Sequence, residues 1–367
     1  MIVFDNVTKR YPGATTAVDG LSLVAPKGKL TVFVGPSGCG KTTSLRMINR
    51  LITPTSGSIL LDGEPTDRMD VALLRRRIGY VIQHAGLFPH RTVVQNVATT
   101  ARLNGVPKAK ALKEAHELLE RVGLTQSFAD RYPYQLSGGQ QQRVGVARAL
   151  ASNPQFMLMD EPFSAVDPVV RGQLQDEFLR LQREIGKTII MVTHDIDEAL
   201  KLGDQVAVLR TGGKLAQVAS PKVLLARPAD GFVADFVGRD RGYRFLSFAA
   251  LDGSLALAAE PTVALGASPE EARGAALDRW VLVADAARQP LGWVDADALR
   301  EPIREGDLNL SGTLAPEGST LRHVLDAALS SPSGRGVVVG PDGGLLGTAR
   351  LPEIVAAIED ARAGAAA

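Results

Sequence analysis

The sequence has 367 residues, of which 45% are hydrophobic and 22% charged, with one cysteine and a formal net charge of +1. This length allows two or more domains with buried cores, and a single cysteine excludes an internal disulfide framework, as is typical of a reducing cytosol. No apolar run reaches the roughly 18 residues needed to span a bilayer, and residues 1–5 do not resemble a signal peptide. We therefore expect any role at a membrane to depend on a partner protein.

The charge is distributed unevenly along the chain. Residues 1–239 contain 30 Lys and Arg against 22 Asp and Glu, a net charge of +8, whereas residues 240–367 contain 11 against 18, a net charge of −7. This change predicts a domain boundary near residue 239. The basic part suits a nucleotide or an anionic membrane surface. It has no Lys/Arg block with interleaved aromatic residues, which argues against nucleic acid.

A glycine-rich motif follows the third predicted strand. Apolar patterns predict strands over residues 2–7, 17–24 and 30–34, and the last precedes G-x-x-x-x-G-K-T and a helix-like segment. Such a loop turns backbone N–H groups and a helix N-terminus toward a polyphosphate. We predict that Lys41 reaches the β- and γ-phosphates and that the Thr42 hydroxyl binds Mg²⁺. The predicted phosphate-binding P-loop comprises Gly35, Pro36, Ser37, Gly38, Cys39, Gly40, Lys41, Thr42 and Thr43.

Tyr11 lies in the first turn, upstream of the P-loop. Its ring is a candidate for stacking on an adenine, and a plain surface tyrosine is the alternative. Further strands are predicted over residues 57–61 and 78–82, the second of which ends at Gln83. The pattern then becomes helical, with an amphipathic helix over 109–122. We interpret residues 84–150 as an inserted helical subdomain.

Strands and helices alternate after this subdomain. Strands are predicted at 156–161, where the strand ends in two carboxylates, and at 188–192, 205–209 and 214–218, with helices at 169–185 and 197–202. This alternation predicts a largely parallel sheet covered by helices. Polar residues follow the apolar strands: Asp160 fits a Mg²⁺-binding carboxylate and Glu161 a general base for water. Gln83 is placed to bridge Mg²⁺ or water, and His194 to contact the γ-phosphate.

Two similar passages follow residue 240. Each is predicted as strand, helix, strand, turn, strand and helix, with a period near fifty residues. We assign them to modules at 240–300 and 301–360, followed by a frayed tail at 361–367.

A five-residue motif at 136–140 reads Leu-Ser-Gly-Gly-Gln, in which the glycines expose backbone N–H groups at a helix start. It is the signature of the ATP-binding-cassette (ABC) ATPases. With the P-loop, Gln83, Asp160–Glu161, a D-loop at 164–167 and His194, residues 1–236 resemble that family in motif order and spacing. The resemblance implies an α/β P-loop NTPase cassette with a mostly parallel sheet, an N-terminal antiparallel β part and a helical subdomain.

The same resemblance implies an ATPase that acts as a dimer of cassettes packed head to tail. ATP with Mg²⁺ would lie between one P-loop and the signature of the second cassette, and hydrolysis would let the halves separate. The residues implied on the partner-facing side are Ser137, Gly138, Gly139, Gln140 and Asp167.

A narrower resemblance is to cassettes of osmoprotectant importers, the glycine betaine, carnitine, choline and proline betaine class. It depends on residues 47–52, 76–83, 86–90, 131–133, 159–163, 173–178 and 195–199. It implies an ATP-hydrolysing subunit at the cytoplasmic face of the membrane, bound to an integral membrane permease and served indirectly by an extracytoplasmic substrate-binding protein. The groove beside Gln83 and residues 87–90 would receive a helix of the permease.

Importers of this class often contain a C-terminal pair of cystathionine-β-synthase-type (CBS) modules, which the α+β repeat resembles. Nucleotide-binding CBS modules usually end in G-x-x-(Ser/Thr)-x-x-Asp. Here Asp295 and Ala298 occupy those places in the first module, and Arg350 and Glu353 in the second. Adenosine nucleotide binding, sensing of ionic strength by the acidic tail, and a structural dimerisation role therefore all stay open.

Three alternative functions remain to be distinguished. The first is an importer cassette for another small solute, such as an amino acid or a sulfonate. The second is a soluble ABC ATPase of DNA repair or translation, although the long coiled-coil insertion or second cassette of those proteins is missing from the sequence. The third is an ATP-independent sensor built around the repeat, which leaves the complete set of catalytic motifs unexplained.

Overall fold

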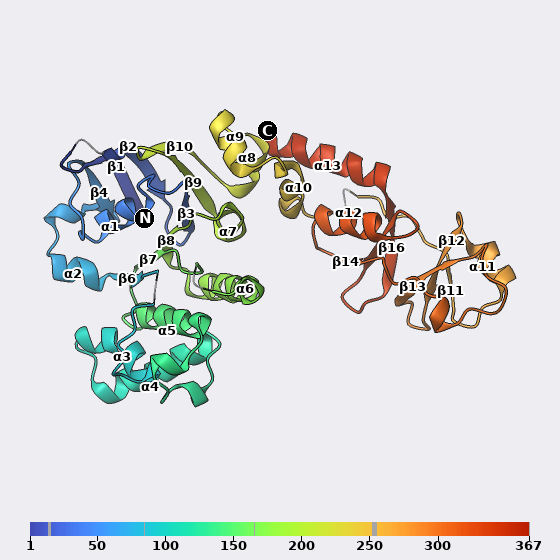
Figure 1. Ribbon diagram of the computed structural model, residues 1–367, viewed down its shortest axis with the longest axis horizontal. Helices are drawn as coiled ribbons and strands as arrows, with labels where there is room; N and C mark the ends of the chain where they lie inside the picture. The colour runs from blue at the N-terminus through green and yellow to red at the C-terminus, as the bar shows by residue number, and fades with distance from the viewer. Residues whose placement is uncertain (14–15, 84, 165, 252–254, 367) are drawn as a thin grey trace. The chain divides into compact units, whose positions relative to one another are not determined.

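The computed structural model describes residues 1–13, 16–83, 85–164, 166–251 and 255–366 (Figure 1). The chain divides into two units: Met1–Leu224 with Pro228–Val237, and Leu225–Arg227 with Gly238–Ala367. Each is described by itself. Over the described ranges, no helix is both long and apolar enough to cross a membrane.

A six-stranded sheet forms the centre of the first unit, in the order β10-β9-β3-β8-β7-β6. All neighbours are parallel except β9 and β10. Strands β3, β7 and β8 are buried along their whole length, which explains their unbroken apolar sequences. The strands are β3 (Leu30–Val34), β6 (Ile78–Val81), β7 (Phe156–Asp160), β8 (Thr188–Val192), β9 (Gln205–Arg210) and β10 (Lys214–Ala219).

A second sheet, in the order β2-β1-β4-β5, is antiparallel throughout and confirms the predicted N-terminal β part. Apolar side chains of β1 and β4, including Phe4 and Ile59, join Phe33 of β3 in one buried core. This core holds the strand that leads into the P-loop. The strands are β1 (Ile2–Arg10), β2 (Thr16–Ala25), β4 (Ser56–Leu61) and β5 (Glu64–Pro65).

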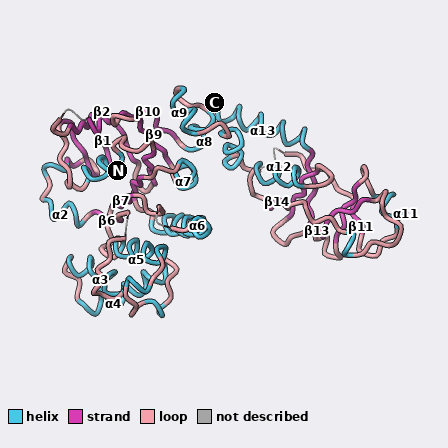
Figure 2. Tube along the Cα trace, in the orientation of Figure 1, coloured by secondary structure: helices cyan, strands magenta, loops and turns pink. Residues whose placement is uncertain are grey.

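Three helices without strands among them pack together in Figure 2, and the last of them also contacts β6: α3 (Val93–Leu103), α4 (Lys108–Arg121) and α5 (Gly138–Leu150). The amphipathic helix predicted over 109–122 is α4, which buries Ala111, Ala115 and Leu119. The other helices up to residue 237 are α1 (Lys41–Ile48), η1 (Thr66–Arg68), α2 (Val71–Arg76), η2 (Gln126–Phe128), η3 (Pro133–Gln135), α6 (Pro168–Ile185), α7 (Ile196–Leu202), α8 (Pro221–Ala226) and α9 (Gly231–Val237).

The second unit contains two three-stranded sheets of the same design. In each, the first two strands are parallel and separated in sequence by a helix, and the last two are antiparallel. The elements are α10 (Arg241–Phe245), η4 (Leu246–Phe248), β11 (Thr262–Val263), α11 (Pro269–Ala275), β12 (Trp280–Ala284), β13 (Pro290–Asp295), η5 (Glu305–Asp307), β14 (Leu314–Pro316), α12 (Leu321–Ser330), β15 (Arg335–Val339), β16 (Leu345–Arg350) and α13 (Leu351–Ala366).

Two details of this unit differ from the sequence-based prediction. The first module has no helix around Ala298, because the Asp295 carboxylate accepts the N–H of Asp297 at 3.2 Å and Pro302 follows shortly after. The residues expected to form a frayed tail continue helix α13 to Ala366, because alanine is the strongest helix former.

Candidate functional site

The loop between β3 and α1 turns tightly at its glycines. Gly40 has a φ of 87°, and a Cβ there would lie 2.1 Å from the carbonyl oxygen of Ala17, so only glycine fits. The buried Lys41 ammonium donates to the carbonyl oxygens of Gly35 at 2.7 Å and Pro36 at 3.0 Å. The cation therefore already lies inside the loop. Burial raises the pKa of the Cys39 thiol, which disfavours the reactive thiolate.

Thr42 and Asp160 provide oxygen atoms at one point beside this loop. The Thr42 hydroxyl donates to Oδ1 of Asp160 at 2.9 Å, and Arg46 lies 3.7 Å from Oδ2. Burial raises the pKa of Asp160, while the Thr42 hydroxyl and the Arg46 charge act in the opposite direction. Hydroxyl and carboxylate oxygens are the ligands that Mg²⁺ prefers, so these two residues fit that ion.

Glu161 joins the ends of three neighbouring strands. Gln83, which follows β6, donates through Nε2 to Oε2 of Glu161 at 3.2 Å. His194, which follows β8, places Nδ1 3.1 Å from the same oxygen. Glu161 itself follows β7 and has a positive φ of 46°, an uncommon conformation outside glycine. Three side chains that are far apart in the sequence thus meet at one carboxylate.

A hollow of about 440 Å³ lies over the P-loop. Its size is in the range of small-molecule sites. Tyr11 does not line it: that side chain is 39% exposed, with the Lys9 ammonium 5.1 Å from its ring. The hollow is lined by Ala17, Ser37, Gly38, Cys39, Gly40, Lys41, Thr42, Thr43, Glu161 and His194.

The signature motif is placed elsewhere and lines no part of this hollow. Ser137 caps α5: its hydroxyl accepts the N–H of Gln140, and the Gln140 side chain accepts the N–H of Ser137 at 3.0 Å. Ser137 and Gly138 are exposed, while a Cβ on Gly139 would lie 3.2 Å from Leu174.

The D-loop leads into α6. Asp167 immediately precedes that helix and is exposed. Ala165 of the D-loop and His84, where the helical subdomain was predicted to begin, lie outside the described residues.

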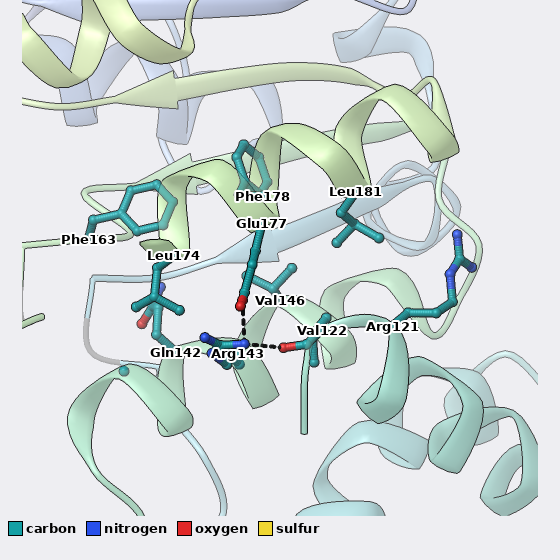
Figure 3. A pocket seen from close by; sticks show the side chains of 11 residues that line it. Arg121, Val122, Gln142, Arg143, Val146, Phe163, Leu174, Glu177, Phe178 and Leu181 are labelled. Carbon is teal, nitrogen blue, oxygen red and sulfur yellow. Dashed lines mark hydrogen bonds and ion pairs between the residues drawn. The ribbon is translucent and has the colours of Figure 1, made fainter. Parts of the chain in front are cut away.

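A separate, mainly apolar hollow lies between α5 and α6 (Figure 3). Its volume of about 40 Å³ leaves room for a few water molecules and not for a nucleotide. Arg143 crosses it, forming an ion pair with Glu177 and donating to the carbonyl oxygen of Val122 at 2.8 Å. The hollow between α5 and α6 is therefore a packing feature of the two helices and not a second nucleotide site.

Comparison with known proteins agrees with this geometry. Residues 18–164 match the family model described as "ABC transporter". The osmoprotectant import ATP-binding protein OsmV of Salmonella typhimurium is 48% identical over 306 residues, 80% of this chain and 79% of that protein. This chain belongs to the ABC transporter ATP-binding family. Members of the family are ATPases that bind ATP with Mg²⁺, and this cassette is one of them.

Two further relatives have similar names. The glycine betaine uptake system ATP-binding protein YehX of Escherichia coli is 50% identical over 67% of this chain and 80% of its own length. The choline transport ATP-binding protein OpuBA of Bacillus subtilis is 50% identical over 66% of this chain, which spans 63% of that protein. Among solved structures, a dimeric cassette, MJ0796, in a post-hydrolysis state with ADP and Pi is 34% identical, with a TM-score of 0.55, and covers 60% of this chain and 99% of its own.

Sequence reasoning missed two residues of the site. Arg46 lies one helical turn after Thr42, a spacing that places both on one face of a predicted helix and gave a usable signal. Ala17 contributes only backbone and a methyl group, and nothing in the sequence marked it.

Proposed function

We propose that this cassette hydrolyses ATP to drive import of small osmoprotectants, of the glycine betaine, carnitine, choline and proline betaine class. The observation that supports hydrolysis best is the meeting of Gln83, Glu161 and His194 beside Lys41. The solute class is supported by relatives at 48–50% identity that are named for osmoprotectant, glycine betaine or choline transport. An importer cassette for another small solute is the competing hypothesis, because a cassette of this family does not itself touch the solute.

The following roles belong to the proposal. Backbone N–H groups of residues 37–43 and the Lys41 ammonium bind the β- and γ-phosphates. Thr42, Asp160 and Gln83 hold Mg²⁺, which neutralises charge that develops on the phosphates. Glu161 accepts a proton from the attacking water. The oxygen of that water bonds to the γ-phosphorus as the bond between the γ-phosphorus and ADP breaks.

The other half of the nucleotide site belongs to a second cassette in this proposal. Ser137 and Gly138 are exposed at the N-terminus of α5, and the motif lines no part of the P-loop hollow, so a nucleotide in that hollow does not reach the motif of the same chain. A second copy packed head to tail places this motif and Asp167 on the γ-phosphate side of ATP. His194, which is exposed and within reach of Glu161, contacts the γ-phosphate. Tyr11 remains a candidate for stacking on the adenine.

The segment after Gln83 is the proposed contact with an integral membrane permease, which places the cassette at the cytoplasmic face of the membrane. Phe88 is 38% exposed, and the Arg91 guanidinium lies 4.8 Å from its ring centroid. The Asn96 side chain binds both backbone groups of Phe88, accepting its N–H at 2.7 Å and donating to its carbonyl oxygen at 3.1 Å. An exposed aromatic ring on a fixed backbone suits a protein interface.

We propose that the second unit is a CBS-like regulatory pair. The shared strand–helix–strand–strand order of its two halves supports this assignment. Two side chains at the positions where related modules bind a nucleotide have other partners: Asp295 accepts from Nε of Arg279 at 2.7 Å, and Glu353 accepts the Arg350 N–H at 2.7 Å. Response to ionic strength is therefore the favoured form of regulation, and a purely structural role is the alternative.

Glu161→Gln tests the hydrolytic role. A general base contributes about 10²–10⁴-fold, so we expect loss of turnover by that factor with ATP binding retained and an ATP-dependent dimer detected by light scattering. Glu184→Gln, in the exposed last turn of α6, is the matched control and should keep wild-type turnover. Hydrolysis at the wild-type rate by Glu161→Gln would reject Glu161 as the general base. Hydrolysis that persists in Lys41→Ala would place the hydrolytic site outside the P-loop.

A further inference from the structure

Two helices of the first unit begin directly after loops that the proposed mechanism uses. The D-loop at 164–167 leads into α6, and residues 193–195 lead into α7. Three polar pairs join the helices: Arg171 with Asp195 (Nη1 to Oδ2, 3.8 Å), Gln175 with Glu198 (Nε2 to Oε1, 3.2 Å), and Asp176 with Lys201 (Oδ1 to Nζ, 2.7 Å). The pairs follow in the same order along both helices, so the two N-termini lie at the same end.

Arg171 is the member of this set nearest to both loops. Its Nη2 donates to the carbonyl oxygen of Val166, in the D-loop, at 3.2 Å, while Nη1 faces Asp195. Its Nε is buried and makes no hydrogen bond within the described part of the chain. The planar guanidinium can hold two groups in a fixed relation, which a lysine ammonium cannot do.

The α7 side is equally well tied to the loop before it. Asp195 caps α7, its Oδ1 accepting the N–H of Asp197 at 2.9 Å, and its own N–H donates to the Thr193 hydroxyl at 3.1 Å. Glu198 is only 5% exposed and accepts from Gln175. Both neighbours of His194 are thus anchored, while His194 itself is free to reach Glu161.

A neighbouring face of α6 packs toward the signature helix α5. Leu174, Phe178 and Leu181 line the hollow of Figure 3, and Glu177 pairs there with Arg143 of α5. Helix α6 therefore contacts both the helix that begins within the signature and the helix that follows His194. A displacement of α6 would therefore be transmitted to both α5 and α7.

We propose that Arg171 is a positioning residue for ATP hydrolysis, which fixes the D-loop to the segment that presents His194 so that the two move together. The inference rests on the proposed function, because it assigns His194 to the γ-phosphate. Closure of a second cassette against the D-loop then moves residues 193–195 through Arg171 and Asp195. The contact makes hydrolysis depend on an assembled dimer.

The test uses the full-length protein with Arg171→Met, Asp195→Asn and the double variant. Asparagine keeps the helix cap and removes the charge, so Asp195→Asn isolates the pair. Amide hydrogen exchange of residues 193–195 should become about two- to fivefold faster in each single variant, the effect of losing one half-exposed ion pair. The kcat for ATP should fall about tenfold with KM changed by no more than about twofold, a split typical of lost positioning.

The double variant should lose no more than Arg171→Met alone, because Asp195→Asn removes only the ion pair that Arg171→Met already removes. Glu184→Gln, on the same helix but far from the D-loop, should match the wild type in exchange and in kcat. Exchange at 193–195 that stays at the wild-type rate in Arg171→Met, or losses that multiply in the double variant, would overturn the proposal. A failure of the import function would appear instead as absent osmoprotectant uptake by the wild-type complex, and would leave the exchange result unchanged.

Discussion

Arg335, 2% exposed, is a buried charge between the two sheets of the second unit. Its guanidinium forms ion pairs with Glu260, 3.1 Å away, and with Asp278, and it lies 4.7 Å from the ring centroid of Trp293. Replacing Arg335→Met removes the charge and keeps an apolar side chain of similar length. Glu260, 1% exposed, would keep the Thr348 hydroxyl at 2.8 Å as a donor.

The expected loss follows from this burial. Removing one partner of a buried ion pair costs about 3–5 kcal/mol, because the other charge stays uncompensated. For a unit of this size that corresponds to a fall in Tm of roughly 10–20 °C.

The loss should also depend on pH. Burial raises the pKa of Glu260, and removing Arg335 raises it further, since the guanidinium favours the carboxylate. A carboxyl whose pKa is higher in the folded than in the unfolded state binds more protons when folded, so stability falls as pH rises between the two values. The variant should therefore be destabilised less at about pH 5 than at about pH 8.

Tryptophan fluorescence isolates this effect, because both tryptophans of the sequence, Trp280 and Trp293, lie in the second unit. Adding Glu260→Gln to Arg335→Met should recover part of the Tm, since the unpaired charge is gone. The control Arg304→Met, which breaks an exposed pair with Glu301, should shift Tm by about 2 °C or less. A Tm shift for Arg335→Met at pH 8 no larger than that of Arg304→Met would contradict this prediction. Equal falls in Tm at pH 5 and pH 8 would contradict it as well.

Three other predictions concern the nucleotide site, the permease contact and the second unit. Gly40→Ala should weaken binding of a fluorescent ATP analogue at least about tenfold, because its Cβ would meet the Ala17 carbonyl oxygen. Gly38→Ala, with open space around it, should lose less affinity. Equal affinities of the two variants would contradict the loop geometry. Phe88→Asp should abolish co-purification with a permease and keep ATP hydrolysis, and intact co-purification would reject this contact. Deletion of 240–367 should shift the salt concentration that activates uptake, and an unchanged threshold would leave a structural role.

The sequence indicated the three side chains proposed for hydrolysis because each follows an apolar strand. Gln83, Glu161 and His194 follow β6, β7 and β8, and parallel strands end at one edge of a sheet, so their meeting required only the strand order. The pair of Arg171 with Asp195 could not be predicted in this way. The tertiary packing of α6 against α7 decides which faces of the two helices meet. No residue spacing in the sequence indicates that packing.

The second unit shows the same division. The repeat predicted both strand patterns, since each strand is a short apolar run between turns. The burial of Arg335 against Glu260 joins positions 75 residues apart and has no local signature. The prediction followed the repeat pattern at two places where local chemistry decided the structure. One Asx turn prevents a helix at Ala298, and alanine propensity extends the last helix to Ala366.

The central claim is that hydrolysis by this cassette moves an osmoprotectant through a permease. An affinity-tagged chain should be purified with its membrane partners from the native host and reconstituted in vesicles with ATP supplied on the cassette side. We predict ATP-dependent uptake of at least one of labelled glycine betaine, carnitine, choline or proline betaine, and none with Glu161→Gln. ATP hydrolysis at wild-type rates without uptake of any of the four would contradict the account.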